Sequence, residues 1–360
     1  MEQHLIDAHF HLSLTRVMSR MENVQDAVDV LEQCGLERLC IQSIVQWEPR
    51  FLTRSPLALL AKQRCPDRIF AFGGIRFPDP DAPDKRFPYR QEAERLIAMG
   101  FDGIKLFGKP TMRQRFGEPF DAPVFDDLYG YLEERQIPLL FHVGDPREFW
   151  SAETAPAFAR ENGWIYNEPD FDTYYAEIEG LMIQHPHLRV LYPHFFFLSD
   201  DLERLRAFLY RWPSVWIDIT PGSEMYHNFS RNPAEARAFF LEFQDRILLG
   251  TDNTGAAPGG PNRSVELAAE RLKTLCDFLT TEHASGWDEV FHGLSLPREA
   301  AGKIMADNFY RYVGRKRPKP VDLHAAAGYA AELAAQAEAA GDPELSAEFV
   351  RILDAYRPWK

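Results

Sequence analysis

Two histidines near the N-terminus, His9 and His11, are the first residues of the sequence whose type and spacing could support chemistry. They follow the apolar run Leu5–Ala8, which is typical of a β-strand. Side chains alternate between the two faces of a strand, so His9 and His11 share a face and can bind one cation. Buried histidines are also often only hydrogen-bonded parts of a core, and the pair alone leaves both interpretations open.

Three further residues of the metal-ligand type, His142, His194 and Asp252, each follow a later apolar run. If these runs are parallel strands of one closed sheet, the five side chains converge where the strands end. Three neutral imidazoles plus a carboxylate suit a borderline divalent cation and leave a position open for water or substrate. The pattern therefore predicts one divalent metal ion, with Zn²⁺ as the first choice and Mn²⁺ or Fe²⁺ as alternatives.

Eight short apolar runs alternate with longer segments of helical periodicity. The predicted strands are Leu5–Ala8, Leu39–Ile41, Ile69–Phe72, Gly103–Phe107, Ile137–Phe141, Val190–Tyr192, Val215–Ile219 and Ile247–Gly250. The clearest predicted helices are Asn23–Cys34, Tyr89–Met99, Phe125–Arg135 and Leu202–Arg211. Near-continuous apolar strands are typical of parallel sheets covered on both faces. Eight such units without a dinucleotide-binding fingerprint predict an α/β fold, a (β/α)8 TIM barrel whose post-strand loops build the active site.

Two segments exceed a minimal barrel. Residues 145–175 contain eight aromatic side chains, which either form a lid over a substrate or pack the loop on the barrel rim. Residues 315–360 begin with a basic, Pro-punctuated linker and continue as an Ala-rich helical hairpin. We therefore expect a barrel over residues 1–314 and a C-terminal helical extension, packed on the barrel or on a partner subunit. The extension and the aromatic segment favour a homodimer.

The sequence resembles the amidohydrolase superfamily over about residues 5–314. The resemblance is to its branch of predicted metal-dependent hydrolases and decarboxylases, which includes aminocarboxymuconate-semialdehyde and resorcylate decarboxylases. The motifs that carry it are Asp7–His11, His142, His194 and the run Leu249–Asp252. The resemblance implies a (β/α)8 barrel enzyme that acts on a small molecule.

The resemblance also implies a role for each residue. In mononuclear members the paired histidines, the fifth-strand histidine and the eighth-strand aspartate bind the metal, which here are His9, His11, His142 and Asp252. The sixth-strand histidine acts on substrate or water, so His194 would be catalytic. Asp252 would also be catalytic, by transferring a proton.

Lys105, on the fourth predicted strand, has three interpretations. Binuclear relatives often bridge two metals with a carboxylated lysine from this strand, so a modified Lys105 would imply a second ion. An unmodified Lys105 could bind an anionic substrate, or it could form a buried ion pair with a carboxylate such as Asp7. As an ammonium it would repel a second cation and favour a single metal.

Two reactions would use the same five residues. The leading prediction is hydrolysis of a small, carboxylate-bearing molecule through a metal-activated water. The alternative is non-oxidative decarboxylation of an aromatic or unsaturated carboxylic acid. Arg76, Lys105 and Arg147 are candidate substrate-binding cations near the mouth. A non-catalytic metal-binding barrel is a minor alternative, because structural metal sites are usually closed by four protein ligands.

The charge balance excludes some classes of partner. The formal net charge is −14 at pH 7, which argues against nucleic acid and anionic membrane surfaces. The sequence has no apolar run long enough to span a membrane and no basic-plus-apolar leader. Its four cysteines form no Cys-x-x-Cys pair, which favours reduced thiols. We therefore expect a cytoplasmic protein.

Overall fold

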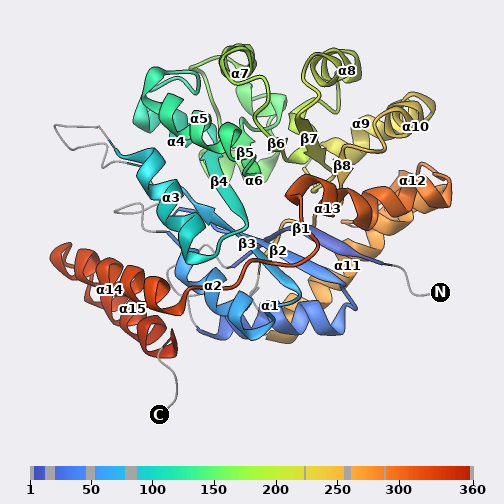
Figure 1. Cartoon of the computed structure of the whole chain (residues 1–360). Helices are drawn as coiled ribbons and strands as arrows, with labels where there is room; N and C mark the ends of the chain where they lie inside the picture. The colour runs from blue at the N-terminus through green and yellow to red at the C-terminus, as the bar shows by residue number, and fades with distance from the viewer. Residues whose placement is uncertain are drawn as a thin grey trace.

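The structure, a computed structural model, describes residues 4–12, 21–45, 53–77, 87–222, 224–254, 261–287 and 289–356. At its centre is a curled parallel sheet surrounded by helices (Figure 1). The strands of this sheet are β1 (Ile6–His11), β2 (Arg38–Gln42), β3 (Ile69–Gly74), β4 (Gly103–Gly108), β5 (Leu139–Val143), β6 (Val190–Tyr192), β7 (Val215–Asp218), β8 (Ile247–Leu248) and β9 (Asn253–Thr254). They pair in the order β8-β7-β6-β5-β4-β3-β2-β1-β9.

Helices follow or separate these strands and cover the outside of the sheet (Figure 1). Those of the barrel are α1 (Met21–Gln33), α2 (Ser55–Arg64), α3 (Tyr89–Met99), α4 (Pro110–Phe116), α5 (Asp126–Glu134), α6 (Ala157–Glu161), α7 (Phe171–Gln184), α8 (Leu202–Arg211), α9 (Met225–Arg231), α10 (Pro233–Glu242), α11 (Pro261–Thr280), α12 (Arg298–Gly302) and α13 (Asn308–Val313). A separate antiparallel hairpin follows α11 and consists of β10 (His283–Gly286) and β11 (Glu289–His292). None of the described helices is both long and apolar enough to cross a membrane.

β8 and β9, the two ends of the sheet, follow each other in the chain and together occupy the eighth strand position of the barrel. β8 pairs with β7, and β9 pairs with β1. Between them the chain stays bonded to β1, because Ala8 donates its backbone N–H to Leu249 at 3.0 Å and Asp252 donates its own to His9 at 2.8 Å. The eighth strand position therefore closes the sheet, and the predicted (β/α)8 barrel is confirmed.

The strand side chains separate into two apolar clusters. The outer cluster packs against the helices and includes Ile104 and Leu106 of β4. The inner cluster fills the barrel interior; it includes Leu140 of β5 and is closed by Phe309 of α13. Because side chains alternate along a strand, Lys105 points inward from β4. The interior thus changes from an apolar layer to a polar one toward the strand ends.

A change of register in β1 aims its histidines into the barrel. From Asp7 to Phe10, β1 advances three residues while its partner β2 advances two, as in a β-bulge. As a result Ala8 belongs to the inner cluster and Phe10 to the outer one, although they are two residues apart. His9 and His11 flank the outward-facing Phe10, so both point inward.

The C-terminal helical extension is a hairpin of α14 (Leu323–Ala339) and α15 (Pro343–Tyr356) that packs on α2 and α3. Asp102 holds the linker before it, by accepting the backbone N–H of Lys319 at 2.8 Å. Glu92 of α3 accepts a hydrogen bond from the Tyr329 hydroxyl of α14 at 3.0 Å. The extension therefore lies against the barrel of its own chain, and the division at residue 314 stays a prediction.

Most strands differ from the predicted bounds by one to three residues, and the differences at β5 and β8 have a clear physical cause. β5 begins at Leu139 rather than at Ile137, since Pro138 has no N–H to give to a ladder. The shift puts His142 inside β5 instead of after it. β8 ends at Leu248, because the N–H of Leu249 leaves the sheet and bonds to the carbonyl of Ile304 at 3.0 Å.

Candidate metal centre

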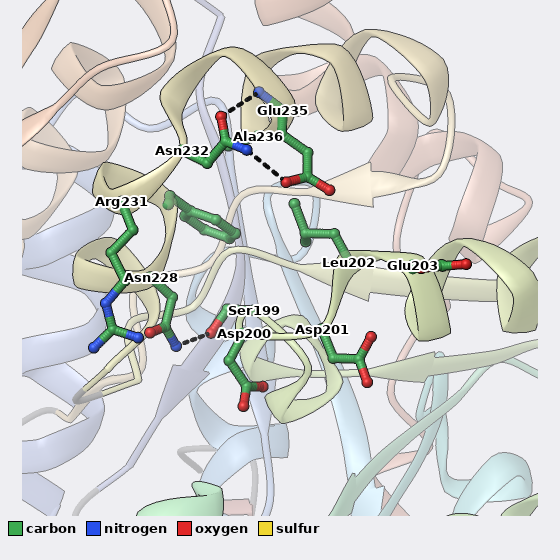
Figure 2. Close-up of a pocket in the computed structure, with 11 residues that line it drawn as sticks. Ser199, Asp200, Asp201, Leu202, Glu203, Asn228, Arg231, Asn232, Glu235 and Ala236 are labelled. Carbon is green, nitrogen blue, oxygen red and sulfur yellow. Dashed lines mark hydrogen bonds between the residues drawn. The ribbon is translucent and has the colours of Figure 1, made fainter.

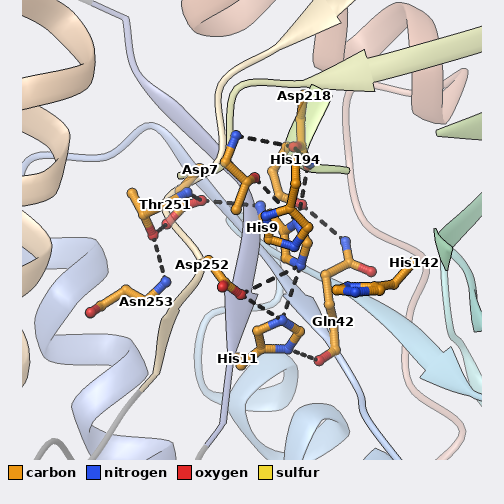
Figure 3. Close-up of polar contacts among 12 residues, drawn as sticks. Asp7, His9, His11, Gln42, His142, His194, Asp218, Thr251, Asp252 and Asn253 are labelled. Carbon is orange, nitrogen blue, oxygen red and sulfur yellow. Dashed lines mark hydrogen bonds and ion pairs between the residues drawn. The ribbon is translucent and has the colours of Figure 1, made fainter. Parts of the chain in front are cut away.

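His9 and His11 lie at the end of β1, and both are buried (Figure 3). Nδ1 of His11 is 2.7 Å from the carbonyl oxygen of Gln42, and because a carbonyl only accepts, His11 donates from Nδ1. Nδ1 of His9 is 3.0 Å from Oδ2 of Asp218, and a carboxylate likewise accepts from it. In this arrangement both Nε2 atoms carry lone pairs, and they lie 3.0 Å apart.

Asp252 adds a third acceptor to the same point. Its Oδ1 is 3.1 Å from Nε2 of His11 and 3.8 Å from Nε2 of His9, and the three ligand atoms all lie within 4.8 Å of one another. Facing lone pairs repel unless a cation lies between them. The residues therefore fit a divalent metal ion.

The segment that carries Asp252 is tied to β1. Asp7 accepts the backbone N–H of Thr251 at 3.0 Å and its hydroxyl at 2.6 Å. Burial raises the pKa of Asp7 to about 7, although these hydrogen bonds oppose the shift. Asp252 has a φ of 52°, which is uncommon for a residue other than glycine. Gly250 allows this segment to approach β1 closely, since a Cβ at position 250 would lie 2.7 Å from Cβ of His9.

Asp218, at the end of β7, is a site residue that the sequence reasoning missed. It is fully buried, and in addition to its contact with His9 its Oδ1 accepts the backbone N–H groups of His194 at 2.8 Å and Thr220 at 3.0 Å. Burial raises the pKa of Asp218, although these hydrogen bonds oppose the shift. One carboxylate thus orients both His9 and His194. A signal was present, because Asp218 is the acidic residue of the apolar run Val215–Ile219.

His194 begins a turn with a rare backbone conformation. All four residues of His194–Phe197 have φ between 51° and 56°, a left-handed conformation that costs free energy for L-residues. The ring of Phe197 stacks on His194, with centroids 5.1 Å apart, and the His194 ring lies 5.6 Å from His9 and 5.0 Å from His142. Burial, with the charge of His142, lowers the pKa of His194 to about 4, so its imidazole is neutral. Its Nδ1 is buried and has no hydrogen-bond partner among the described residues.

His142 lies beside the group formed by His9, His11 and Asp252 rather than within it. Its Nε2 is 3.1 Å from the carbonyl oxygen of Gly144 and donates to it, which leaves the lone pair on Nδ1. Burial lowers the pKa of His142 to about 4. Its role as the fourth metal ligand stays a prediction, with Nδ1 as the ligand atom.

Lys105 is 1% exposed, and its Nζ has no hydrogen-bond partner in the part of the chain that the structure describes. Burial lowers the pKa of Lys105 to about 7, while the charges of Asp252 and Asp218 oppose the shift. The suggested ion pair with Asp7 is not present, because that carboxylate accepts from His9 and Thr251 instead. Lys105 is therefore a buried amine beside the predicted metal ligands, and none of the described residues pairs with it.

Arg76 and Arg147 each have a carboxylate partner, unlike Lys105. Arg76 makes two hydrogen bonds to Glu92, at 2.6 and 3.0 Å, next to the C-terminal hairpin. Arg147 lies 3.3 Å from Asp200, and its guanidinium is 4.1 Å from the centroid of Phe171. Both arginines therefore pair with a carboxylate of the chain in this structure, and a substrate contact by either arginine stays a prediction.

The aromatic segment 145–175 has a small core of its own. Phe149 and Tyr166 are buried there, with Trp150 and Trp164 packed against them. Four of the eight rings therefore pack the segment itself, whereas Phe171, Tyr174 and Tyr175 belong to the outer cluster of the barrel. Its first residue, Asp145, accepts a hydrogen bond from the Tyr166 hydroxyl at 2.6 Å and lies 3.5 Å from Nζ of Lys109, which follows β4.

A cavity of about 300 Å³ lies away from the metal ligands, between the turn after β6 and helices α9 and α10 (Figure 2). It is lined by Ser199, Asp200, Asp201, Leu202, Glu203, Asn228, Phe229, Arg231, Asn232, Glu235 and Ala236. Asp201 and Asn232 use their side chains to cap α8 and α10. The cavity therefore shares no residue with the predicted site.

The protein-family comparison agrees with this geometry. The family model described as amidohydrolase matches residues 6–315. The chain belongs to the amidohydrolase family. Two curated relatives of this chain are gamma-resorcylate decarboxylases. One, from Rhizobium radiobacter, is 23% identical over 267 residues, which is 70% of this chain and 73% of the relative. The other, from Rhizobium sp. (strain MTP-10005), is 22% identical over 264 residues, or 69% and 72%.

Solved structures show the same fold. A 4-oxalomesaconate hydratase from Rhodopseudomonas palustris aligns with a TM-score of 0.52 at 15% identity, covering 86% of this chain and 96% of that one. A protein from Staphylococcus aureus described as a putative amidohydrolase aligns with a TM-score of 0.51 at 15% identity, covering 87% and 100%. At this level of identity the likeness concerns the barrel alone.

Proposed function

We propose that this protein is a metal-dependent decarboxylase that removes CO2 non-oxidatively from an aromatic or unsaturated carboxylic acid. The observation that carries the proposal is Lys105, a buried amine without a partner among the described residues, next to a donor set for a divalent cation. A carboxylate offers such an amine a counter-charge and restores its protonated form, which a neutral substrate does not. The two gamma-resorcylate decarboxylases among the relatives support the same reaction class.

The proposed metal ligands are His9, His11, His142 and Asp252, a set that suits Zn²⁺. When bound, the ion supplies a positive charge that polarises a substrate oxygen and draws electron density from the reacting carbon. A charged Lys105 next to this set repels a second cation, so we propose one ion for each chain. Two ions for each chain would favour a carboxylated Lys105 instead.

The side chains have distinct tasks in this reaction. Lys105 binds and orients the substrate through an oxygen anion. The bond between the substrate carbon and its carboxylate breaks, CO2 leaves, and the electron pair stays on the carbon, which then takes a proton. His194 is placed to relay that proton from solvent, because Asp218 holds its backbone and its Nδ1 has no other partner among the described residues. The neutral ring takes a proton from solvent at one nitrogen and gives up the proton of the other nitrogen to the carbon.

Hydrolysis is a second candidate, and one observation favours it. Asp252 places a carboxylate oxygen 3.1 Å from Nε2 of His11, inside the predicted metal site, where it can accept a proton from an attacking water molecule. Decarboxylation needs no such acceptor. In this alternative His194 would stabilise the oxyanion that develops on the substrate.

The two reactions release different products. Metal-loaded protein would be incubated in D2O with gamma-resorcylate and a panel of hydroxybenzoates, and in parallel with lactones and amides. We expect CO2 release with one deuterium at the vacated carbon, no release by His11→Ala, and unchanged release by Arg90→Met, whose side chain pairs with Glu94 on the surface. Hydrolysis of the second panel without CO2 from the first would overturn the proposal.

A further inference from the structure

We propose that Lys109 is a second anion-binding residue of this site and that the substrate carries two acidic groups, as a planar dicarboxylate does. This inference rests on the proposed decarboxylation and names its substrate class. In it, the first acidic group faces Lys105, and the second is bound by Lys109 at the edge of the aromatic segment.

Lys109 lies at the mouth of the barrel, directly after β4 and four residues beyond Lys105. Its side chain is 14% exposed, so the amine is largely removed from solvent yet still reachable. Nζ of Lys109 lies 3.4 Å from the centroid of the Trp164 ring, which belongs to the aromatic segment. The indole face attracts the cation but accepts no ordinary hydrogen bond from it.

The polar partner of Lys109 is shared with other groups. Oδ2 of Asp145 is 3.5 Å from Nζ of Lys109, a long contact, and the same oxygen accepts a hydrogen bond from Tyr166 at 2.6 Å. Oδ1 of Asp145 is 3.8 Å from Nε2 of His142. Asp145 thus lies between Lys109 and the predicted metal ligand His142, and the ammonium keeps N–H directions free for another acceptor.

The charges around the mouth suit a doubly charged ligand. A divalent ion, Lys105 and Lys109 would place several positive charges around one opening of an otherwise acidic protein. A single carboxylate would reach Lys105 and the ion but leave Lys109 with Asp145 alone. A second carboxylate would replace that long contact with a direct charge-assisted hydrogen bond. The competing explanation is that Lys109 and Asp145 only attach the aromatic segment to β4.

The test compares ligands that differ by one carboxylate. Binding of benzoate, isophthalate and terephthalate to the zinc-loaded protein is measured by titration calorimetry. We expect at least one dicarboxylate to bind about tenfold tighter than benzoate, the gain expected of one charge-assisted hydrogen bond. Equal affinities for all three would overturn the inference while leaving the decarboxylation intact. Failure to bind benzoate itself would count against the proposed function and, with it, this inference.

Three variants test whether Lys109 binds the ligand or only attaches the aromatic segment to β4. Lys109→Met should remove the advantage of the dicarboxylate and leave benzoate binding within about twofold, and Lys109→Arg should retain most of that advantage. Asp145→Asn should strengthen dicarboxylate binding, because it removes the competing charge while its amide oxygen still accepts from Tyr166. If Lys109→Met keeps the advantage, or if Asp145→Asn weakens dicarboxylate binding, Lys109 only attaches the segment.

Discussion

The two ends of the barrel treat a buried lysine in opposite ways. Near the amino ends of the strands, Lys62 is 0% exposed and donates to the carboxylate of Asp102 at 2.5 Å and to the carbonyl of Gly100 at 2.6 Å. Toward the carboxyl ends, Lys105 is equally buried, and its amine has no partner among the described residues. The same residue type is satisfied at one end and unsatisfied at the other.

This difference between Lys62 and Lys105 indicates that one end of the barrel stabilises the fold and the other end carries the function. Burying a charge costs free energy unless it is paired, and Asp102 meets this cost at the first end while also accepting backbone N–H groups from Ala71 and Lys319. That end attaches the C-terminal extension to the barrel. At the second end the cost of burying Lys105 is not offset within the described chain. We therefore expect substitutions at the first end to act on folding and those at the second end on activity.

The largest effect is expected when a metal ligand is removed. His11→Ala should abolish stoichiometric metal binding and lower the decarboxylation rate by more than about 1000-fold, because the positive charge that acts on the substrate is lost. Metal content by mass spectrometry and CO2 release check this. His324→Ala, at an exposed histidine of α14, is the matched control. A His11→Ala protein with full metal content would contradict the proposed centre.

At the opposite end, Lys62→Met should lower the free energy of unfolding by about 3 to 5 kcal/mol, because it leaves the buried Asp102 without its counter-ion. Urea unfolding measures this change. Metal content and turnover of the folded fraction should stay as in the wild type. The double variant with Asp102→Asn should recover part of the loss, since the uncompensated charge is gone. A loss below about 1 kcal/mol would show that the pair does not stabilise the fold.

Lys105→Met should lower activity but not stability, the reverse of what we expect for Lys62→Met. We expect activity to fall about 100-fold, as when one charged contact to the reacting group is lost. The free energy of unfolding should stay the same or rise, because a buried amine without a partner is replaced by an apolar side chain. Decarboxylation rates and urea unfolding, measured on the same samples, test these two expectations. A destabilisation as large as that of Lys62→Met would remove the contrast between the two ends.

The smallest expected effect concerns pH. Burial, with the charges of Arg315 and Lys62, lowers the pKa of Lys319 from 10.5 to about 8. Between these values the unfolded chain binds more protons than the folded one, so the free energy of unfolding should rise with pH through that window. Below pH 8 the penalty of charging Lys319 is fully present. Lys319→Gln should raise stability at pH 7 and flatten the rise; an unchanged slope would contradict this.

The sequence predicted the eight-stranded barrel and the approach of His9, His11 and Asp252, because strand alternation and the common end of parallel strands follow from local patterns. It did not predict how those residues are aimed. The register shift in β1 depends on its pairing with β2, and the left-handed turn at His194 is built from four non-glycine residues whose types favour no such conformation. Both depend on tertiary contacts.

Residues that support the site were harder to find than the ligands. Asp218 looks like part of an ordinary strand until its two histidine partners, from β1 and from the turn after β6, are brought together. Lys109 and Trp164 are 55 positions apart in the printed sequence and show no pattern that links them. Arg76 is the opposite case, a residue that the sequence singled out for the site. Its position after the third strand predicted a place at the mouth of the barrel, but its side chain is hydrogen-bonded to Glu92 beside the C-terminal hairpin.

The barrel closes at the same segment that supplies Asp252, between β8 and β9, and this gives the metal a mechanical task. An ion held by His9, His11 and Asp252 would join the first strand to the last, so it would act as a clasp on the seam of the barrel. The amide of Asp252, which bonds across the seam to His9, should then exchange with solvent more slowly once the ion is bound. Amide exchange at the seam would thus report metal occupancy without any substrate being added.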